Sequence, residues 1–533
     1  MIVLGDIPKR WSSLTPEKIC MVCTGYGEVR LNWAAFNERI NRLANSLKKL
    51  GLKKGDHVAI LLENCHRYAE IYYAMAKTGI IPVPLNLRLH PNELQYIIQN
   101  SDAVGFIVGP EFKEVYGALK PSLSRVKYFI SAVERIPGME YYEDLVERGS
   151  PQEPKARIHE NDTVMLMYTG GTTGMPKGAV LTHRGLMTFI TGCVLSNMRN
   201  NVPRTDDDGT LFILPAFHIS LWPILTFHFS GDKVVMVSKP DLKKIFEAIE
   251  KEKITHMNAV PTVYFWLVND PNIEKYDLSS VKAFSYAGAP MPTEILKQCI
   301  KKFGNIFSQG YGATEGGPWT TLYARDHVID GSEKEMKKLK SVGRPAMVSE
   351  IRVVDEKGHD CKPGEVGEII VRSKSTMKEY WKDPEKTAKV KKGDWYYTGD
   401  IGSFDEDGFL YLADRASDMI KSGGEKVYPF EVEDVLYRHP AVSEAIVIGI
   451  PDLEWGEKVH AVIYLKPDHF EKYRGKERSL KSEMTDFCRQ NLTHYKCPKG
   501  IDFSPDPLPK TAVGKMLRKE VREKYREIYR TSK

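Results

Sequence analysis

The sequence predicts an α/β protein whose large N-terminal domain holds helix-covered, mostly parallel sheets. First, strand-like apolar runs alternate with helix-like segments over roughly residues 1–300, a pattern typical of parallel sheets. Second, short strands separated by turns follow near residue 350 and predict a small antiparallel sheet or distorted β-barrel. Third, the pattern changes again near residue 417, which predicts a smaller α+β domain at the C-terminus.

The N-terminal elements follow from the spacing of apolar residues. A helix is predicted where apolar residues recur every three or four positions, and Gly51 supplies its end. A second helix is expected over 68–77, ending at Gly79. The apolar residues of the first helix are Trp33, Phe36, Ile40, Leu43, Leu47 and Leu50. The strands are predicted at 58–62, 104–108, 164–167, 233–237, 254–260 and 281–286.

The later elements are shorter. Short strands are predicted at 350–354 and 365–372, after a charged stretch at 331–340 that reads as a solvated insertion. In the C-terminal domain, we expect helices and strands in alternation. The helices are predicted at 430–437 and 479–491, and the strands at 442–450 and 459–465.

Composition excludes several classes of protein. With 533 residues the chain is too long for one core, so at least two domains are expected. A net charge of +6, from 76 basic and 70 acidic residues, does not indicate nucleic-acid binding. No apolar run reaches the length of a membrane span, and the N-terminal apolar stretch is too short for a signal peptide. We therefore expect a cytoplasmic protein, with the oligomeric state, a homodimer included, left open.

Eight cysteines are spread widely along the chain. Cys20 and Cys23 form a single C-x-x-C pair without a second pair or a nearby pair of histidines. A zinc or redox role for this pair is an alternative, but free thiols in a reducing compartment are the preferred interpretation.

The most informative segment is a loop rich in glycine and threonine that ends in a lysine. Its glycines let backbone N–H groups approach an anion, while the hydroxyls and the lysine add donors and charge. Pro176 precedes Lys177 and Gly178 follows it, so the Walker pattern does not fit. A flexible surface loop is the alternative. The candidate phosphate-binding residues are Thr169, Gly170, Gly171, Thr172, Thr173, Gly174 and Lys177.

Further motifs follow in a fixed order. They are Tyr311-Gly-Ala-Thr-Glu315, Tyr397-Thr-Gly-Asp400, Asp414-Arg415 with Ile420-Lys-Ser-Gly-Gly424, and Pro509-Lys-Thr-Ala-Val-Gly-Lys515. Together with the loop, they resemble the adenylate-forming superfamily, which includes acyl- and aryl-CoA ligases, adenylation domains of peptide synthetases, and beetle luciferases. The resemblance extends from about residue 30 to about residue 520.

The resemblance implies three parts of the chain and three cofactors. It implies an AMP- and acyl-binding domain at 1–413, a hinge at 414–417, and a mobile lid at 418–533. ATP, Mg²⁺ and coenzyme A are the implied cofactors, with AMP formed from ATP. The hinge position carries Ser417, where the family usually has Asp or Lys.

The resemblance also implies roles for individual residues around ATP. The loop would hold the leaving pyrophosphate, Thr314 would contact the α-phosphate, and Glu315 would hold Mg²⁺. A vicinal diol suits a bidentate carboxylate acceptor, which favours Asp400 for the ribose. Without the full motif set, Glu315 and Asp400 would read as a surface charge and a turn residue. The adenosine contacts would be Gly288, Ala289, Pro290, Tyr311, Gly312, Asp400 and Arg415.

The lid would supply residues for both half-reactions. By resemblance, Lys515 reaches the α-phosphate and the carboxylate during adenylation, where it stabilises charge. Rotation of the lid would then withdraw Lys515 and bring Gly423 and Gly424 beside the pantetheine tunnel.

The acyl pocket is expected near four further residues. His218 lies by the nucleotide and the acyl carboxylate if the resemblance holds, and a packed structural histidine is the alternative. Trp222 and Trp319, with Gly316 nearby, either cap the pocket or belong to the core. A capped pocket favours a cyclic, aromatic or medium-chain acid.

The expected reaction is therefore AMP-forming acid–CoA ligation. The alternatives are a long-chain fatty acid–CoA ligase, an enzyme that loads a carrier protein, and a luciferase-like oxygenase. The physiological direction of the reaction is left open.

Overall fold

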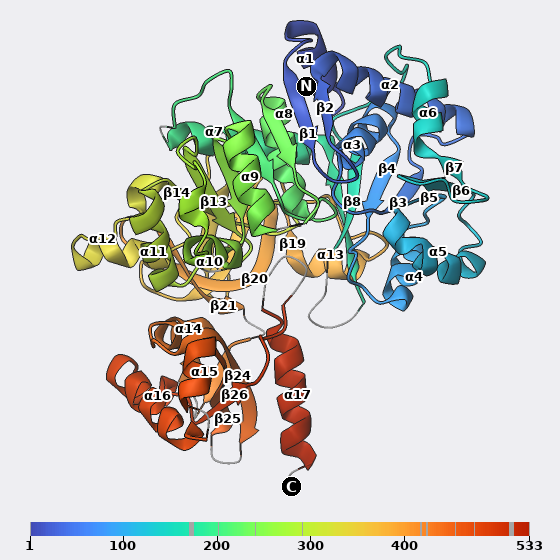
Figure 1. Cartoon of the computed structure of the whole chain (residues 1–533). Coiled ribbons are helices and arrows are strands. Elements are labelled where there is room, and N and C mark those ends of the chain that lie inside the picture. Colours follow the sequence, from blue (N-terminus) through green and yellow to red (C-terminus); the bar gives the residue numbers. More distant parts are fainter. Residues whose placement is uncertain are drawn as a thin grey trace.

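The structure is a computed structural model of the whole chain. It describes residues 2–169, 175–200, 202–239, 241–289, 291–415, 418–422, 425–452, 455–473, 475–510 and 516–531. Sheets covered by helices make up its larger part, and the elements from α14 onward lie at one end of the molecule (Figure 1). The predicted α/β class is confirmed.

The largest sheet has nine strands, six of which run parallel in its centre. In spatial order they are β16 (Arg344–Pro345), β15 (Thr320–Leu322), β14 (Phe307–Tyr311), β13 (Ala283–Ala287), β12 (His256–Ala259), β10 (Gly209–Phe212), β11 (Lys233–Met236), β1 (Ile19–Cys23) and β2 (Val29–Asn32). The two strands at one edge and the single strand at the other are antiparallel to their neighbours. The helices of this part are α7 (His183–Arg199), α8 (Trp222–Phe229), α9 (Leu242–Glu252), α10 (Pro261–Asn269) and α11 (Thr293–Phe303).

The second sheet has five strands, all parallel. They are β4 (Ile81–Pro84), β3 (His57–Leu61), β5 (Gly105–Val108), β6 (Tyr128–Ser131) and β7 (Glu140–Tyr141). Strands buried on both faces of a parallel sheet read as continuous apolar runs, as the sequence predicted here. The helices of this part are α1 (Asp6–Leu14), α2 (Trp33–Leu50), α3 (His66–Thr78), α4 (Pro91–Asn100), α5 (Lys113–Leu119) and α6 (Tyr142–Arg148).

Helix α2 forms where the sequence predicts it. The Asn32 side chain accepts a hydrogen bond from Ala35 N at 2.8 Å and caps its N-terminus. Gly51 adopts the left-handed conformation that ends it. Trp33 and Phe36 are fully buried and pack edge-on against His228 of α8. This contact joins the helices of the second sheet to the nine-stranded sheet.

The strand at 164–167 departs from the prediction. It belongs to β8 (Thr163–Thr169), which pairs antiparallel with β9 (Lys177–Thr182) and with neither parallel sheet. The glycine-rich loop therefore joins the two strands of a hairpin, and α7 begins only after β9 with Thr182 as its N-cap. The error arose because β8 is as apolar as a parallel strand: Leu166 and Val180 pack into the core beside the second sheet.

A third sheet is antiparallel, as predicted for the segment after residue 350. Its strands are β17 (Glu350–Val354), β18 (Gly367–Arg372), β20 (Trp395–Phe404), β19 (Lys391–Lys392) and β21 (Leu410–Arg415). Helix α13 (Pro384–Val390) precedes β19. The charged stretch at 331–340 forms the exposed helix α12 (Glu333–Lys337), although the nearby Leu339 is buried.

The C-terminal elements form an α+β unit with its own sheet. Its strands are β22 (Ile420–Ser422), β23 (Glu425–Val427), β24 (Val442–Asp452), β25 (Gly456–Leu465) and β26 (Gly500–Ser504). Its helices are α14 (Pro429–Tyr437), α15 (Pro467–Tyr473), α16 (Glu477–Asn491) and α17 (Arg518–Thr531). Helices α14 and α16 pack on one face, and Val521 of α17 packs on the other. Lys340 pairs with Asp434 of α14 at 3.0 Å, which connects this unit to the N-terminal part.

A buried ion pair fixes three helices of the N-terminal part. Glu70 of α3 is fully buried and accepts hydrogen bonds from Arg39 Nε of α2 at 2.7 Å and from Tyr142 OH of α6 at 2.7 Å. Burial alone would raise the pKa of the Glu70 carboxyl, but the charge of Arg39, His66 and these hydrogen bonds together lower it. The carboxylate is therefore ionised in the folded protein.

Replacing Glu70 by Ala should destabilise the N-terminal part by about 3 kcal/mol, because the Tyr142 hydroxyl loses its buried partner and Arg39 keeps only Glu143. Chemical denaturation followed by tryptophan fluorescence measures this. The control is Glu38→Ala: its partner Arg42 lies at 2.8 Å on an exposed helix face, so a change of about 0.5 kcal/mol or less is expected. Equal losses of stability in the two variants would contradict a special stabilising role for the buried Glu70 carboxylate.

The Glu70 contribution should also depend on pH. Its folded-state pKa is lowered, so the stabilisation is present above the unfolded pKa of about 4.3 and is lost as pH falls through the folded value. The difference in unfolding free energy between wild type and Glu70→Ala should therefore shrink in acid. If this difference in unfolding free energy grew on acidification, the pKa of Glu70 would be raised by folding and not lowered.

Candidate functional site

The phosphate-loop hairpin presents its two flanking residues side by side. Thr169 at the end of β8 is the register partner of Lys177 at the start of β9. Lys177 Nζ lies 5.4 Å from the centre of the Tyr380 ring. Residues Gly170, Gly171, Thr172, Thr173 and Gly174 lie outside the described residues, so their predicted contacts stay predictions.

The Thr314–Glu315 pair follows β14, at the carboxyl edge of the large sheet, where ligands bind in open α/β sheets. Both residues are at most 9% exposed. Glu315 Oε1 accepts a hydrogen bond from Tyr380 OH at 2.7 Å, and Glu315 O accepts one from Met377 N at 2.6 Å. In the part of the chain that the structure describes, neither lysine nor arginine forms an ion pair with this buried carboxylate.

The predicted adenosine residues meet at the same edge. Tyr311 OH donates to Asp400 Oδ2 at 2.6 Å, although 89 residues separate the two in sequence. Asp400 is also the register partner of Arg415 across β20 and β21. The side chain of Arg415 lies outside the description, so its orientation stays a prediction.

The two glycine-containing turns of the adenosine site lie on neighbouring strands. Ala287 of β13 pairs with Gly310 of β14, so Gly288 and Ala289 follow one strand where Gly312 follows the next. Gly288 has φ +84°, and a Cβ atom there would have no neighbour within 4 Å. A Cβ on Gly312 would lie 2.7 Å from Gly317 Cα, so Gly312 is required for close backbone packing. Pro290 lies outside the described residues.

The residues predicted for the acyl pocket have different environments. His218 is half-buried after β10, and its Nδ1 accepts a hydrogen bond from Ser220 N at 3.3 Å. Trp222 is half-buried and packs edge-on against Phe189 of α7. Trp319 is fully buried between Tyr311 and Tyr396, which favours the core interpretation for this tryptophan.

Gly316 is constrained by its neighbours. It has φ +140°, and a Cβ atom there would lie 2.5 Å from Thr376 Cα. A Cβ atom would therefore clash with the backbone. The turn that carries Glu315 packs directly against the backbone of residues 375–376. Gly316 is therefore a packing requirement of this turn.

The remaining predicted residues lie in the C-terminal unit, outside the described part of the chain. They are Gly423, Gly424 and Lys515. The hinge residue Ser417 is likewise outside it. Their roles rest on the sequence motifs alone.

Sequence reasoning missed Tyr380. It contacts both Glu315 and Lys177. Burial first, and then the adjacent Glu315, raise the pKa of the Tyr380 hydroxyl, so it stays protonated and donates. No local pattern marks it, because its partner lies 65 residues away in the sequence.

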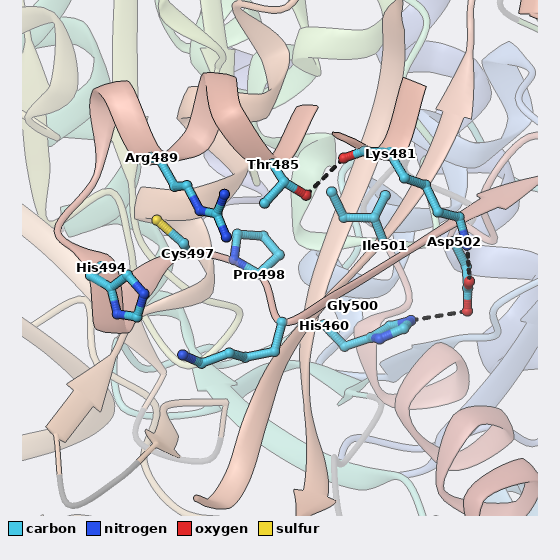
Figure 2. Close-up of a pocket in the computed structure, with 11 residues that line it drawn as sticks. His460, Lys481, Thr485, Arg489, His494, Cys497, Pro498, Gly500, Ile501 and Asp502 are labelled. Carbon is cyan, nitrogen blue, oxygen red and sulfur yellow. Dashed lines mark hydrogen bonds and ion pairs between the residues drawn. The ribbon is translucent and has the colours of Figure 1, made fainter. Parts of the chain in front are cut away.

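Two pockets lie away from these residues. One, of about 490 Å³, is in the C-terminal unit between α16, β25 and β26. Asp502 on its wall bonds His460 at 3.1 Å and Lys481 at 3.0 Å (Figure 2). The other, of about 530 Å³, is lined mainly by basic residues between 48 and 54 and between 155 and 159. Neither contains a residue predicted for the nucleotide site.

Comparison with known families decides the identity of the fold. Residues 9–381 match the family described as AMP-binding enzyme, and residues 431–515 match the AMP-binding enzyme C-terminal domain. The chain belongs to the AMP-binding enzymes. The predicted resemblance to the adenylate-forming superfamily is thereby confirmed, and the two matches cover most of the chain.

Individual relatives span nearly the full length of the chain. A feruloyl-CoA synthase of Amycolatopsis sp. is 34% identical, over 98% of this chain and 99% of its own. The long-chain-fatty-acid–CoA ligase FadD13 of Mycobacterium tuberculosis is 32% identical, over 93% and 94%. The structure of an o-succinylbenzoate CoA synthetase (MenE) from Bacillus subtilis, with the acyl-adenylate intermediate OSB-AMP, matches with a TM-score of 0.81, 30% identity and 97% of both chains.

Replacing Gly316 by Ala should raise the dissociation constant for ATP about tenfold, because the added methyl group displaces the Glu315 turn from the 375–376 backbone. Isothermal titration calorimetry measures this. Gly358→Ala is the matched control: Gly358 also has positive φ, but a Cβ there has no neighbour within 4 Å. Similar ATP affinity in both variants would contradict a positioning effect on the turn.

Proposed function

We infer that this AMP-forming acid–CoA ligase activates a cyclic, aromatic or medium-chain monocarboxylic acid. One observation carries the assignment of the nucleotide site. The Glu315 turn and the Tyr311–Asp400 hydrogen bond gather at one sheet edge, and Tyr380 links Glu315 to Lys177 of the hairpin. Phosphate-binding, ribose-binding and carboxylate groups are therefore assembled from segments far apart in sequence.

In the first half-reaction, an oxygen of the substrate carboxylate attacks the α-phosphorus of ATP. The bond from the α-phosphorus to the oxygen bridging to the β-phosphate breaks, and pyrophosphate leaves with that electron pair. We assign Lys177 and the loop to the leaving group, and Thr314 with Lys515 to charge on the α-phosphate. Asp400 and Tyr311 would orient the ribose and the adenine.

The residues around Glu315 fit Mg²⁺. Among the described residues, the one hydrogen-bond donor to this buried carboxylate is a neutral tyrosine hydroxyl, and such a carboxylate suits a hard cation. The described residues contain no group of three or more metal-binding side chains, which agrees with a magnesium ion held by one carboxylate and by ATP phosphates. When bound, Mg²⁺ would neutralise charge on the phosphates.

In the second half-reaction, the thiol sulfur of coenzyme A attacks the acyl carbonyl carbon. The bond from that carbon to the AMP oxygen breaks, AMP leaves, and the thiol proton passes to solvent. We assign rotation of 418–533 about 414–417 to the change between half-reactions, with Gly423 and Gly424 beside the thiol. Asp434 of the lid contacts Lys340 and Thr293 of the N-terminal part, and rotation would exchange these contacts.

The acid preference rests on the surroundings of Trp222 and on the relatives. Half-buried Trp222 packs on Phe189 and would form a flat wall, which suits a ring. The similarity to a feruloyl-CoA synthase favours an aromatic acid, and that to a long-chain-fatty-acid–CoA ligase favours the alternative. Trp319 no longer contributes, since it is fully buried.

We also propose a cytoplasmic location. All eight cysteines are free thiols, which suits a reducing compartment. Among the helices that the structure describes, none has the length and apolar composition of a membrane span. A homodimer stays a prediction that size-exclusion chromatography with light scattering would test.

Replacing Lys515 by Ala should lower the rate of adenylation by about a thousandfold or more, because a positive charge is lost where the transition state gains negative charge. Thioester formation from supplied acyl-adenylate should stay within about twofold of wild type, since rotation removes this lysine from the site. The two half-reactions are followed separately by mass spectrometry. An equal loss in both would overturn the assigned role.

A panel of acids identifies the substrate class. Each acid is incubated with ATP, Mg²⁺ and coenzyme A, and AMP and acyl-CoA are quantified. Preferred turnover of aromatic, alicyclic or medium-chain acids supports the proposal. Preference for long fatty acids refutes the flat wall at Trp222, and acid-dependent AMP without a CoA thioester indicates a carrier protein as acceptor.

A further inference from the structure

Residues 378–381 pair through their backbone with β9 of the phosphate-loop hairpin. Lys378 N donates to Val180 O at 2.8 Å, Val180 N donates to Glu379 O at 2.9 Å, and Trp381 N donates to Gly178 O at 2.7 Å. Ala179 and Tyr380 form an antiparallel bridge between these bonds. The position of β9, and with it Lys177, is therefore set by this segment.

The same segment is bonded to the Glu315 turn. Met377 N donates to Glu315 O, and three residues later Tyr380 OH donates to Glu315 Oε1. Lys391 Nζ donates to Met377 O at 2.9 Å and Lys378 O at 3.0 Å, which holds the start of the segment in place. One short stretch of chain thus contacts both parts of the predicted phosphate and metal site.

Tyr380 itself contacts the two opposite charges of the site. Its ring lies under the Lys177 ammonium, at a distance that allows a cation–π interaction, while its hydroxyl reaches Glu315. No ion pair joins Lys177 to Glu315 among the described residues. A direct Lys–Glu pair would neutralise the carboxylate that a cation needs and the ammonium that a phosphate needs. One aromatic side chain therefore satisfies both groups without cancelling their charges.

We propose that Tyr380 is a positioning residue that holds the Glu315 carboxylate for Mg²⁺ and links it to Lys177 of the phosphate loop. This inference rests on the proposed function, because it takes Glu315 as the magnesium ligand. The hydroxyl occupies one carboxylate oxygen and fixes the side-chain rotamer, which leaves the second oxygen for the cation.

The test is Tyr380→Phe, which keeps the ring over Lys177 and removes only the hydroxyl. The dissociation constant for ATP is measured by calorimetry with and without Mg²⁺, in the absence of acid and coenzyme A. Mg²⁺ increases the affinity for ATP by some factor in wild type, and this factor should be roughly tenfold smaller in the variant. That is the size expected for loss of a hydrogen bond to a charged group. Its ATP affinity without Mg²⁺ should stay within about twofold of wild type.

A double-mutant cycle separates positioning from ordinary packing. Glu315→Gln should abolish most of the Mg²⁺-dependent gain, and adding Tyr380→Phe should then change it little, because both variants act through one carboxylate. Additive losses would overturn the proposal. The matched control is Tyr411→Phe, which removes a hydroxyl bonded to Asp405 at 3.0 Å in the same antiparallel sheet. In Tyr411→Phe, the Mg²⁺-dependent gain in ATP affinity should equal that of wild type.

Steady-state kinetics gives a second readout. In acid-dependent ATP–pyrophosphate exchange, Tyr380→Phe should raise the KM for Mg²⁺ roughly tenfold and leave kcat at saturating Mg²⁺ within about twofold. An unchanged KM for Mg²⁺ in a variant of wild-type melting temperature would refute the role of Tyr380. Absence of exchange in the wild type would instead refute the proposed function. If Tyr380→Phe fails to fold, Glu315→Asp keeps the charge but shortens the side chain away from the Tyr380 hydroxyl, and it should raise the KM for Mg²⁺ by a similar factor.

Discussion

The backbone ladder between β9 and residues 378–381 is the interaction on which the candidate site depends. A loop that binds phosphates must present glycines and hydroxyls at the surface, so it can bury little apolar area of its own. Its position must come from the strands that carry it, and β8 and β9 alone form only a two-stranded sheet. Residues 378–381 supply further backbone hydrogen bonds to β9 and also carry the contact with Glu315. The proposed nucleotide site therefore depends on the segment just before α13 being correctly folded.

Two buried glutamates show how charge compensation distinguishes a structural group from a functional one. Glu70 is paired with Arg39 and with a tyrosine hydroxyl, so its charge is neutralised within the protein. Glu315 receives a tyrosine hydroxyl but has no cationic partner among the residues that the structure describes. A buried carboxylate left in this state is costly unless a cation from solution completes it. The contrast gives Glu315 a role that burial alone would not suggest.

Much of the fold could be predicted from the sequence because local residue patterns indicate its helices and strands. The spacing of Trp33, Phe36 and Ile40, with Gly51 at the end, predicted α2, and apolar runs predicted the parallel strands. The hairpin could not be predicted, since β8 carries the same apolar pattern as a strand of a parallel sheet and only its partner distinguishes it. Tyr380 was missed for a related reason: its function depends on contacts across 65 residues. The partners Tyr311 and Asp400 were found only through the family motifs, although their hydrogen bond is direct.

Acid-dependent exchange of labelled pyrophosphate into ATP, measured without coenzyme A, tests the account most directly. Exchange should require the acid and Mg²⁺ and proceed without the thiol, because the adenylate forms in a separate and reversible first step. Exchange that requires coenzyme A, or release of ADP and phosphate instead of AMP and pyrophosphate, would contradict it.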